Sequence, residues 1–289
     1  MTMSESEHKL LDTQGKFLRV IQDGRKLNDA NWTPGRIILS NKRLLVATDD
    51  GKLTIPLSEI RDLGGRFDVN QAVASVSEYV SLRHGGDVML FTLPDTEGFK
   101  WALYEALLDS AIVLAKHPAV EGGVVQDTEW EKARISIETG TVGLAIASGS
   151  FVQVELADIG NVNTEERHVS GEQRPVVEVE HTEGPTSVET HVAATERRSD
   201  LLESLLADGV RRNEIEIDLD GAEQQVLMAL YSGVSPFEIP DFVGIDIEEV
   251  EEIYERLIEL DVLDEVRKRR EVTLTTRGRN LASESINDE

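Results

Sequence analysis

Apolar and polar residues alternate along much of the first two thirds of the chain, in short runs that end at glycine-containing turns. Residues 44–48 and 53–57 are separated by Asp-Asp-Gly, and residues 142–147 and 151–156 are separated by Ser-Gly-Ser. Because glycine reaches positive φ without a steric penalty, both junctions are typical of β-hairpins. Further strand pairs are predicted at 79–83 with 87–92 and at 176–181 with 186–192.

One pattern of apolar and basic residues occurs twice, at a spacing of 98 to 99 residues. The first copy contains Trp32, Arg36, Ile37, Leu39, Leu57 and Ile60, and the second contains Trp130, Arg134, Ile135, Ile137, Leu156 and Ile159. Because the predicted strands follow in the same order in both copies, the pattern indicates an internal duplication.

Each copy ends in an apolar pattern of helical period. In the first copy, residues 94–97 are a helix start signal, and in the second Thr195 is a candidate N-cap. The apolar stripes are Phe99, Leu103, Ala106, Leu107, Ser110 and Leu114 in the first copy, and Leu201, Leu202, Leu205 and Leu206 in the second. One closing helix is therefore predicted for each copy.

Around six antiparallel strands followed by one helix, in about 100 residues, describe a small β-barrel or sandwich closed by a helix. Pleckstrin-homology-like domains have this layout. We therefore predict a multidomain α+β chain, in which residues 1–120 form a first pleckstrin-homology-like domain and residues 121–212 a second. A third domain is expected over residues 213–289.

The pattern changes character in this third domain. Residues 214–219 alternate as a short strand, and Asp220 is a candidate N-cap for a helix over 222–231 that Gly233 ends. Asp246 is a candidate N-cap for another helix over 247–260. Between them, a short helix is predicted to begin at Ser235 and Pro236, to bury Phe237, Ile239 and Phe242, and to end at Gly244.

A hairpin is predicted next, with strands at 263–266 and 271–275 around the basic run 267–270. Residues 276–279 then open a closing helix. Three helices followed by a hairpin are typical of a winged-helix domain, so we predict this fold for residues 213–289.

The charge balance is strongly acidic, with 55 Asp and Glu against 29 Lys and Arg and a formal net charge of −26. Only 9 of the 29 bases are Lys, a composition typical of proteins from very salty cytoplasm, where salt screens carboxylate repulsion. The charge is −2 over residues 1–120, −10 over 121–212 and −14 over 213–289. Most of this acid is expected to be a solubility coat, but the first domain stands apart as nearly neutral.

The third helix of the expected winged domain argues against DNA binding. Between residues 246 and 259 it carries seven carboxylates and a single base, Arg256. Duplex DNA carries one negative charge per about 1.7 Å of axis and would repel this helix. The basic wing leaves a weak DNA contact open, but a protein partner is the preferred prediction.

No catalytic motif is present. The sequence has no cysteine, and neither a phosphate-binding glycine loop nor a nucleophile-elbow motif. His181 and His191 could face each other across the turn at 183–184, but two histidines without a third ligand are more typical of exposed strand positions than of a metal site. We therefore predict no enzyme activity, no cofactor and no metal.

Basic residues concentrate in one part of the nearly neutral first domain. Residues 16–43 contain Lys16, Arg19, Arg25, Lys26, Arg36, Lys42 and Arg43, against only Asp23 and Asp29. This basic segment is a candidate docking surface for an acidic protein, and the basic wing of Arg267, Lys268, Arg269 and Arg270 is a second candidate. Ordinary surface charge partly neutralised by later acids of the same domain, or an anionic-lipid site, are the alternatives.

The chain as a whole resembles the archaeal taxis protein CheF family. The resemblance rests on the stretch from Trp32 to Leu44, on its echo from Trp130, and on the expected winged-helix end. It implies an adaptor in chemotaxis and phototaxis that links the response regulator CheY, with CheC- and CheD-type proteins, to accessory proteins of the archaellum motor. That role controls switching of rotation direction, and the acidic composition fits a halophilic member.

A transcription regulator built from a sensor module and a winged helix is the alternative function. A pull-down that recovers chemotaxis proteins would favour the adaptor, and one that recovers a promoter fragment would favour the regulator. The longest apolar runs are too short to span a membrane, and the N-terminus has no signal-peptide pattern, so a cytoplasmic protein is expected, with possible recruitment to the motor base.

Overall fold

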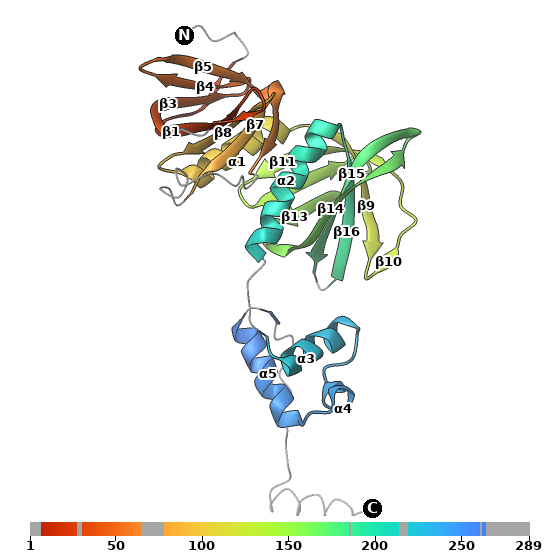
Figure 1. The fold of residues 1–289 in the computed structure, drawn as a ribbon. Helices are drawn as coiled ribbons and strands as arrows, with labels where there is room; N and C mark the ends of the chain where they lie inside the picture. Colours follow the sequence, from red (N-terminus) through yellow and green to blue (C-terminus); the bar gives the residue numbers. More distant parts are fainter. Residues whose placement is uncertain are drawn as a thin grey trace, which may run out of the picture. The chain divides into compact units, whose positions relative to one another are not determined.

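The computed structural model describes residues 7–27, 31–64, 78–184, 186–213, 219–260 and 262–263. The chain forms two compact units, Met1–Ile215 and Glu216–Glu289. Within the described ranges, no helix combines the length and the apolar character that crossing a bilayer requires. In the residues that the structure describes, the first unit has two antiparallel sheets and two α-helices, and the second has three α-helices (Figure 1).

The first sheet contains eight strands, and every pair of neighbours is antiparallel. They are β1 Lys9–Gln22, β2 Arg25–Lys26, β3 Thr33–Ser40, β4 Arg43–Thr48, β5 Gly51–Pro56, β6 Ile60–Leu63, β7 Val80–His84 and β8 Asp87–Thr92. Their order is β5-β4-β3-β1-β8-β7-β6, and β2 pairs with β1. A 3-10 helix, η1 (Leu57–Glu59), joins β5 to β6.

The second sheet repeats this arrangement. Its strands are β9 Ile112–Glu121, β10 Val124–Val125, β11 Glu131–Glu138, β12 Thr141–Ile146, β13 Phe151–Glu155, β14 Ile159–Val169, β15 Glu172–Glu183 and β16 Thr186–Ala193. Their order is β13-β12-β11-β9-β16-β15-β14, with β10 on β9, and η3 (Leu156–Asp158) joins β13 to β14. The identical strand order confirms the duplication that the spacing predicts, and all four predicted hairpins are present.

The pattern did not predict β1 and β9, although each is the middle strand of its sheet. Each pairs with one strand that follows soon after it and with another that lies much further along the chain, such as β8 for β1. The second sheet begins at Ile112, before residue 121 where the second domain is expected to start.

The repeated Trp and Arg-Ile positions have one structural role in each sheet. Ile37 and Leu39 in β3, like Ile135 and Ile137 in β11, lie in the hydrophobic core on the inner face. Trp32 packs on a smaller apolar cluster that contains Leu18, Val20, Val88 and Leu90, and Trp130 packs on the cluster of Val169, Val176 and Ala193. The motif therefore marks a strand that is apolar on its inner face and the tryptophan that leads into it.

Helix α1 (Thr96–Leu108) begins where the sequence predicts, because the Asp95 side chain accepts a hydrogen bond from the Gly98 N–H at 2.8 Å. It ends earlier than predicted. Ser110 has a positive φ of 60°, and Leu114 lies in β9, where it pairs with Lys132 of β11. Placing these two residues on the helical stripe was wrong, because pairing with β11 draws the chain into the second sheet.

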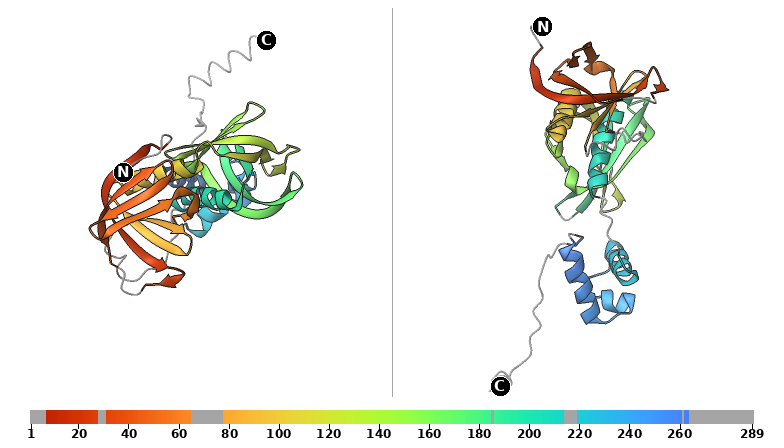
Figure 2. Two further views of the ribbon diagram at one scale, coloured as in Figure 1. Left: turned by 90° about the horizontal axis from the view of Figure 1, so that it is seen from above. Right: turned by 60° about the vertical axis from the view of Figure 1, so that its left-hand side comes forward.

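Helix α2 (Glu196–Asn213) follows Thr195 directly, and its predicted face is confirmed. Leu201, Leu202, Leu205 and Leu206 are all buried. Both helices lie between the two sheets, since α1 contacts β1 and β11 while α2 contacts β6 and β14 (Figure 2). One hydrophobic core therefore runs through both repeats instead of two separate cores.

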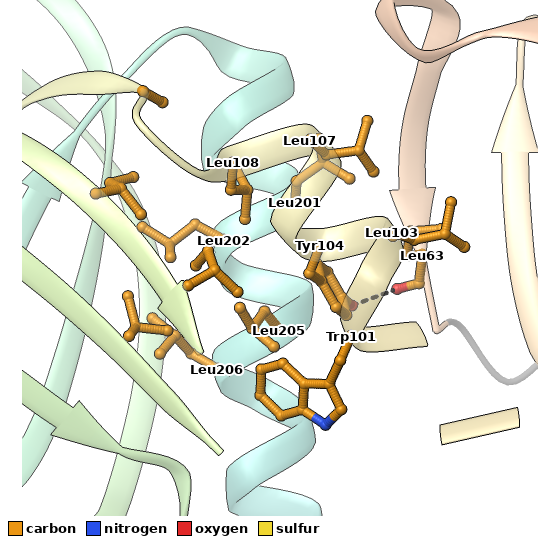
Figure 3. Close-up of a cluster of buried hydrophobic side chains, with 14 of the residues drawn as sticks. Leu63, Trp101, Leu103, Tyr104, Leu107, Leu108, Leu201, Leu202, Leu205 and Leu206 are labelled. Atoms are coloured by element: carbon orange, nitrogen blue, oxygen red, sulfur yellow. Dashed lines mark hydrogen bonds between the residues drawn. The ribbon is translucent and has the colours of Figure 1, made fainter. Parts of the chain in front are cut away.

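Polar contacts reinforce this shared layer. Figure 3 shows Tyr104 of α1 reaching the backbone of Leu63, to whose carbonyl its hydroxyl donates at 3.2 Å. The Arg197 guanidinium of α2 donates to the carbonyls of Ile60 and Leu57, each at 2.6 Å. Lys100 of α1 pairs with Asp208 of α2. Burial raises the pKa of the Tyr104 hydroxyl, so this group stays neutral in its place between the repeats.

The second unit contains α3 (Gly221–Tyr231), α4 (Ile239–Val243) and α5 (Ile247–Glu259). Asp220 and Asp246 cap α3 and α5 through their side chains, as predicted, and Gly244 ends α4 with a φ of 81°. The small core consists of Val226, Ala229, Ile239, Val250, Ile253 and Leu257.

Two expectations for α4 were wrong. The helix begins at Ile239 instead of Ser235, because residues 235–238 form a turn that precedes it. Phe237 and Phe242 are 70% and 65% exposed, and only Ile239 of the predicted apolar face is buried. Phe237 lies in the turn before the helix, so helical spacing does not direct it toward the core.

Most of the remaining expectations for this unit fall outside the described residues. They are the strand at 214–219, the hairpin at 263–266 and 271–275 with the basic wing 267–270, and the closing helix from residue 276.

Candidate partner-binding surfaces

The seven bases of the basic segment lie on four neighbouring strands of the first sheet. Lys16 and Arg19 are in β1, Arg25 and Lys26 in β2, Arg36 in β3, Lys42 in the turn after β3, and Arg43 at the start of β4. Pairing of β2 with the end of β1, and of β3 with its beginning, spreads these bases along the full length of β1.

Arg36 is held by a carboxylate that the sequence did not assign to it. Its guanidinium donates to both oxygens of Asp12 in β1, at 2.7 and 2.8 Å, and Lys9 donates to the same carboxylate at 2.8 Å. The hydrogen bond from Arg36, followed by the one from Lys9, holds the pKa of Asp12 well below its usual range. The same contact raises the pKa of Arg36.

Two further arginines of the basic segment are paired within the first sheet. Arg43 donates to both oxygens of Glu7, at 2.8 and 3.0 Å, and the Glu7 side chain is buried. Arg19 Nε lies 3.8 Å from Asp87 of β8. The interpretation as surface charge neutralised within the domain therefore applies to these arginines. The expectation of later acids is correct only for Arg19, because Asp12 and Glu7 precede the basic segment in the chain.

Lys16 and Arg25 have a different environment. Both are exposed, and neither has an ion-pair partner among the residues that the structure describes. Arg25 lines an open pocket together with Gln22, Asp23 and Leu27 at the β1–β2 turn. The cations at these two positions can meet an acidic surface without first breaking an internal pair.

Lys52 is an exposed base of the first sheet that lies outside the basic segment. The strand registers place Arg36 opposite Ala47 and Ala47 opposite Lys52, so that Lys52 of β5 is in the same row across the sheet. Lys52 lies on the outer face, since its neighbour Leu53 packs against the core. The alternation of residues 51–56 predicts that Lys52 lies on the outer face of the sheet. Only the pairing of β3 with β4, and of β4 with β5, places Lys52 in the same row as Arg36.

Helix α5 presents an acidic surface. Glu248, Glu249, Glu251, Glu252, Glu255 and Glu259 are all exposed. Its one base, Arg256, lies 3.1 Å from Glu223, whose carboxylate is buried in the core of the unit. The positive charge of Arg256 is therefore paired within the unit, and the six glutamates of α5 face solvent.

His181 and His191 of the second sheet are not exposed strand residues as expected, whereas His168 of β14 is exposed. His181 and His191 are 2% and 7% exposed, and they do not face each other. His191 lies by Trp130 on the outer face of the sheet, while His181 stacks with His117 of β9 at a ring-centroid distance of 6.1 Å. Burial lowers the pKa of both His117 and His181, so their neutral forms are favoured.

Similarity to known proteins supplies evidence of another kind. The family model described as archaeal chemotaxis signal transduction system protein F matches residues 9–212. A second model, described as a domain of unknown function, matches residues 218–287. The first match covers both sheets and both helices of the first unit, and the second covers the C-terminal unit.

Two proteins of Halobacterium salinarum are similar over most of the chain. Taxis protein CheF1 is 53% identical over 290 residues, which cover 99% of this chain and 100% of that protein. Taxis protein CheF2 is 25% identical over 270 residues, which cover 88% of this chain and 90% of that protein. The similarity extends through both units instead of being confined to one.

Proposed function

The chain belongs to the family of archaeal chemotaxis signal transduction system protein F, and we propose that it acts there as an adaptor. In this proposal it connects the response regulator CheY, together with CheC- and CheD-type proteins, to accessory proteins of the archaellum motor. Binding at the motor base then controls the direction of rotation. The observation that carries the proposal is full-length similarity to a taxis protein without a catalytic motif in the sequence.

The first repeat supports docking of an acidic partner. A response regulator has an acidic phosphoacceptor pocket, and phosphorylation makes it more negative. Lys16 and Arg25 are exposed cations in the nearly neutral third of an acidic chain. Arg25 pairs with Gln22 in the ladder, so six residues of β1, about 20 Å, separate the two positions. One interface of standard size covers that span.

The second unit supports binding of a protein in preference to DNA. We assign it a winged-helix fold, with α3, α4 and α5 as its helices and residues 263–275 as its wing. The exposed carboxylates of α5 would repel a phosphate backbone, whereas they suit a basic protein surface. The basic wing at 267–270 remains the second candidate docking site.

The architecture of the first unit suits a scaffold. A meander of four main strands and a meander of three, followed by a helix, support the assignment of each repeat as a pleckstrin-homology-like domain. The fused helical layer holds the outer faces of both sheets on one body, so separate faces can bind different partners. We assign to these outer faces a role in binding, without catalysis.

A binding assay in high salt tests this proposal. The purified chain is immobilised and exposed separately to CheY, with and without an acyl-phosphate analogue, to CheC- and CheD-type proteins, and to motor accessory proteins. The double variant Lys16→Glu and Arg25→Glu reverses two exposed cations without breaking the Arg36 or Arg43 pairs. We expect the affinity for at least one partner to fall about tenfold or more, because two cations would face an acidic surface as anions.

Lys132→Glu is the control, because it reverses a cation in the same way, at one position instead of two, on the exposed side of β11, the equivalent of β3 in the second repeat. It is expected to bind every partner as the unaltered chain does. Retention of every partner by the double variant would remove the basic segment from the proposal. Failure of the unaltered chain to bind any of these proteins, with a shift of a promoter fragment instead, would favour the transcription regulator.

A further inference from the structure

Three potential metal ligands converge at one end of the second sheet. His117 comes from β9, and His181 and Glu183 come from β15. Their ligand atoms all lie within 4.8 Å of one another. Thr190 of β16, which is fully buried, lies between the two imidazole rings.

An irregularity in the strand pairing allows this convergence. In the β9–β16 ladder Glu189 pairs with Val120 and His191 pairs with Lys116, and the register shifts between these two pairs. His117 and Thr190 therefore lie in the bulge and take no regular position in the ladder. Bulges redirect side chains, and this one places His117 beside Thr190, which keeps its regular pairing with Val179 of β15 on the same face as His181.

Thr190 can set the orientation of both rings. Its hydroxyl oxygen lies 2.7 Å from His117 Nδ1 and 2.8 Å from His181 Nε2. Because a hydroxyl oxygen can accept two hydrogen bonds, it can receive an N–H from each ring. His117 Nε2 and His181 Nδ1 then keep their lone pairs, which is the form of imidazole that binds metals.

The remaining nitrogen of each ring lacks a suitable partner in that arrangement. His181 Nδ1 is buried and, within the described part of the chain, has no hydrogen-bond partner. His117 Nε2 lies 3.3 Å from Glu183 Oε1, so a nitrogen lone pair would face a carboxylate. A cation between these groups would satisfy all three, since each would then donate an electron pair to it.

We propose that His117, His181 and Glu183 bind one divalent transition-metal ion, with Zn²⁺ as the best fit. Two imidazoles and one carboxylate are a well-known zinc ligand set that leaves a fourth position for water or another ligand. Tetrahedral Zn²⁺ at about 2.0–2.1 Å from its ligands places them about 3.3 Å apart. Glu183, whose side chain is 42% exposed, has the freedom to close this distance and opens the site to solvent.

The hydroxyl of Thr190 would support the site from outside the ligand shell. Hydrogen bonds to the second nitrogen of a metal-bound histidine fix its ring and its tautomer. The ion would join β9 to β15 across β16, the strand that lies between them in the sheet. It would therefore stabilise the end of the sheet at the β15–β16 turn, independently of the docking surfaces proposed above.

Titration of the metal-stripped full-length chain with Co²⁺ and Zn²⁺ tests the proposal. Tetrahedral Co²⁺ with nitrogen ligands absorbs visible light, which separates this site from weak binding to surface carboxylates. We expect one Co²⁺ per chain, displaced by Zn²⁺, and an unfolding temperature that rises with Zn²⁺ concentration. Glu183→Gln and His117→Ala should each weaken Co²⁺ binding at least about tenfold.

The control is the double variant His191→Ala and Glu189→Gln. It removes a histidine and glutamate pair, 3.1 Å apart, whose histidine lies on the outer face of the same sheet. This variant should bind Co²⁺ with unchanged affinity and spectrum. Because Glu183 is exposed, Glu183→Gln should fold normally, and the unfolding temperature of the metal-free variant checks this.

Two outcomes would overturn the proposal. One is the absence of a saturable Co²⁺ spectrum in the unaltered chain, which would leave the metal-free contact of His117 with Glu183 as the better account. The other is equal binding by the unaltered chain and Glu183→Gln, or a loss of binding in the His191 control, which would place the ion elsewhere.

Discussion

Asp12 and Arg36 lie on neighbouring strands, and their pairing shows that the fold decides whether a charged side chain is available to a partner. Arg36 is one of seven bases in a basic segment, but in the sheet it is engaged by a carboxylate 24 residues earlier in the chain. The pairing of Asp12 with Ile38 and of Gln14 with Arg36 brings the two side chains together on one face. The sequence identifies the cation, and the strand register identifies its partner.

Replacement of Arg36 tests the electrostatics of this pair. In Arg36→Gln, we expect the pKa of Asp12 to rise toward its usual range, because the hydrogen bond from Arg36 is the largest cause of its lowering. Carboxyl chemical shifts followed by NMR during an acid titration measure the pKa directly. Lys9→Gln removes the second-largest cause and should produce a smaller rise.

The effect on stability has a definite sign. Because the pKa of Asp12 is lower in the folded state, the pair stabilises the fold above the usual Asp range, and this contribution is lost as the pH falls through the folded pKa. In Arg36→Gln, the free energy of unfolding should therefore change less as the pH falls through that range. An Asp12 pKa that does not move in Arg36→Gln would contradict the pairing.

At the scale of elements, α2 is the helix that joins the two repeats. It packs on β14 and η3 of its own repeat and on β6 of the other. The close approach to η3 depends on Gly209, where an added Cβ would lie 2.7 Å from the carbonyl oxygen of Leu156. Glycine is unfavourable within a helix, so its presence here follows from packing and not from propensity.

Gly209→Ala should destabilise the first unit in spite of improving the helix. The gain in propensity is about 1 kcal/mol, whereas forcing a methyl group against rigid backbone costs about 1–3 kcal/mol. We expect a net loss of about 1 kcal/mol and a lower midpoint in denaturant unfolding. Gly160→Ala in β14, where the nearest atom would be 3.7 Å away, is the control and should not lower the midpoint.

If Gly209→Ala unfolded at the same denaturant concentration as the unaltered chain, α2 would be able to move away from η3 at little cost. This result would contradict the inference that α2 packs rigidly against η3.

At the scale of the whole molecule, the two repeats are joined by a common core. Residues from both sheets and both helices belong to one buried cluster. Arg197 of α2 adds hydrogen bonds to Ile60 and Leu57 of the first repeat. The second unit has a core of its own, formed by α3, α4 and α5.

Fragments test whether the first unit is one folding unit. Residues 1–215 should unfold in a single transition with the midpoint of the full-length chain, because the core is continuous. Residues 1–110 alone should not fold stably, since they lack α2, which covers β6 and packs against α1. All three tryptophans lie before residue 215, so their fluorescence reports this unit without interference from the second.

Calorimetry of residues 1–215 provides the decisive comparison. Two separate transitions, or a stably folded fragment of residues 1–110, would mean that the repeats are independent domains and that the helical layer between them adds little.

The sequence determined the features that depend on neighbouring residues. Alternation, turn glycines and helix caps act within a few positions, which is why the hairpins at 49–51 and 148–150, the caps at Asp220 and Asp246, and the duplication were predicted. The tertiary structure alone decided the features that join distant segments. The pairing of β1 with β3 set the partner of Arg36. Long-range pairing through β1 and β9 set the shared core and the meeting of His117 with His181 and Glu183. No local signal encodes a contact that forms only when strands 60 or more residues apart come side by side.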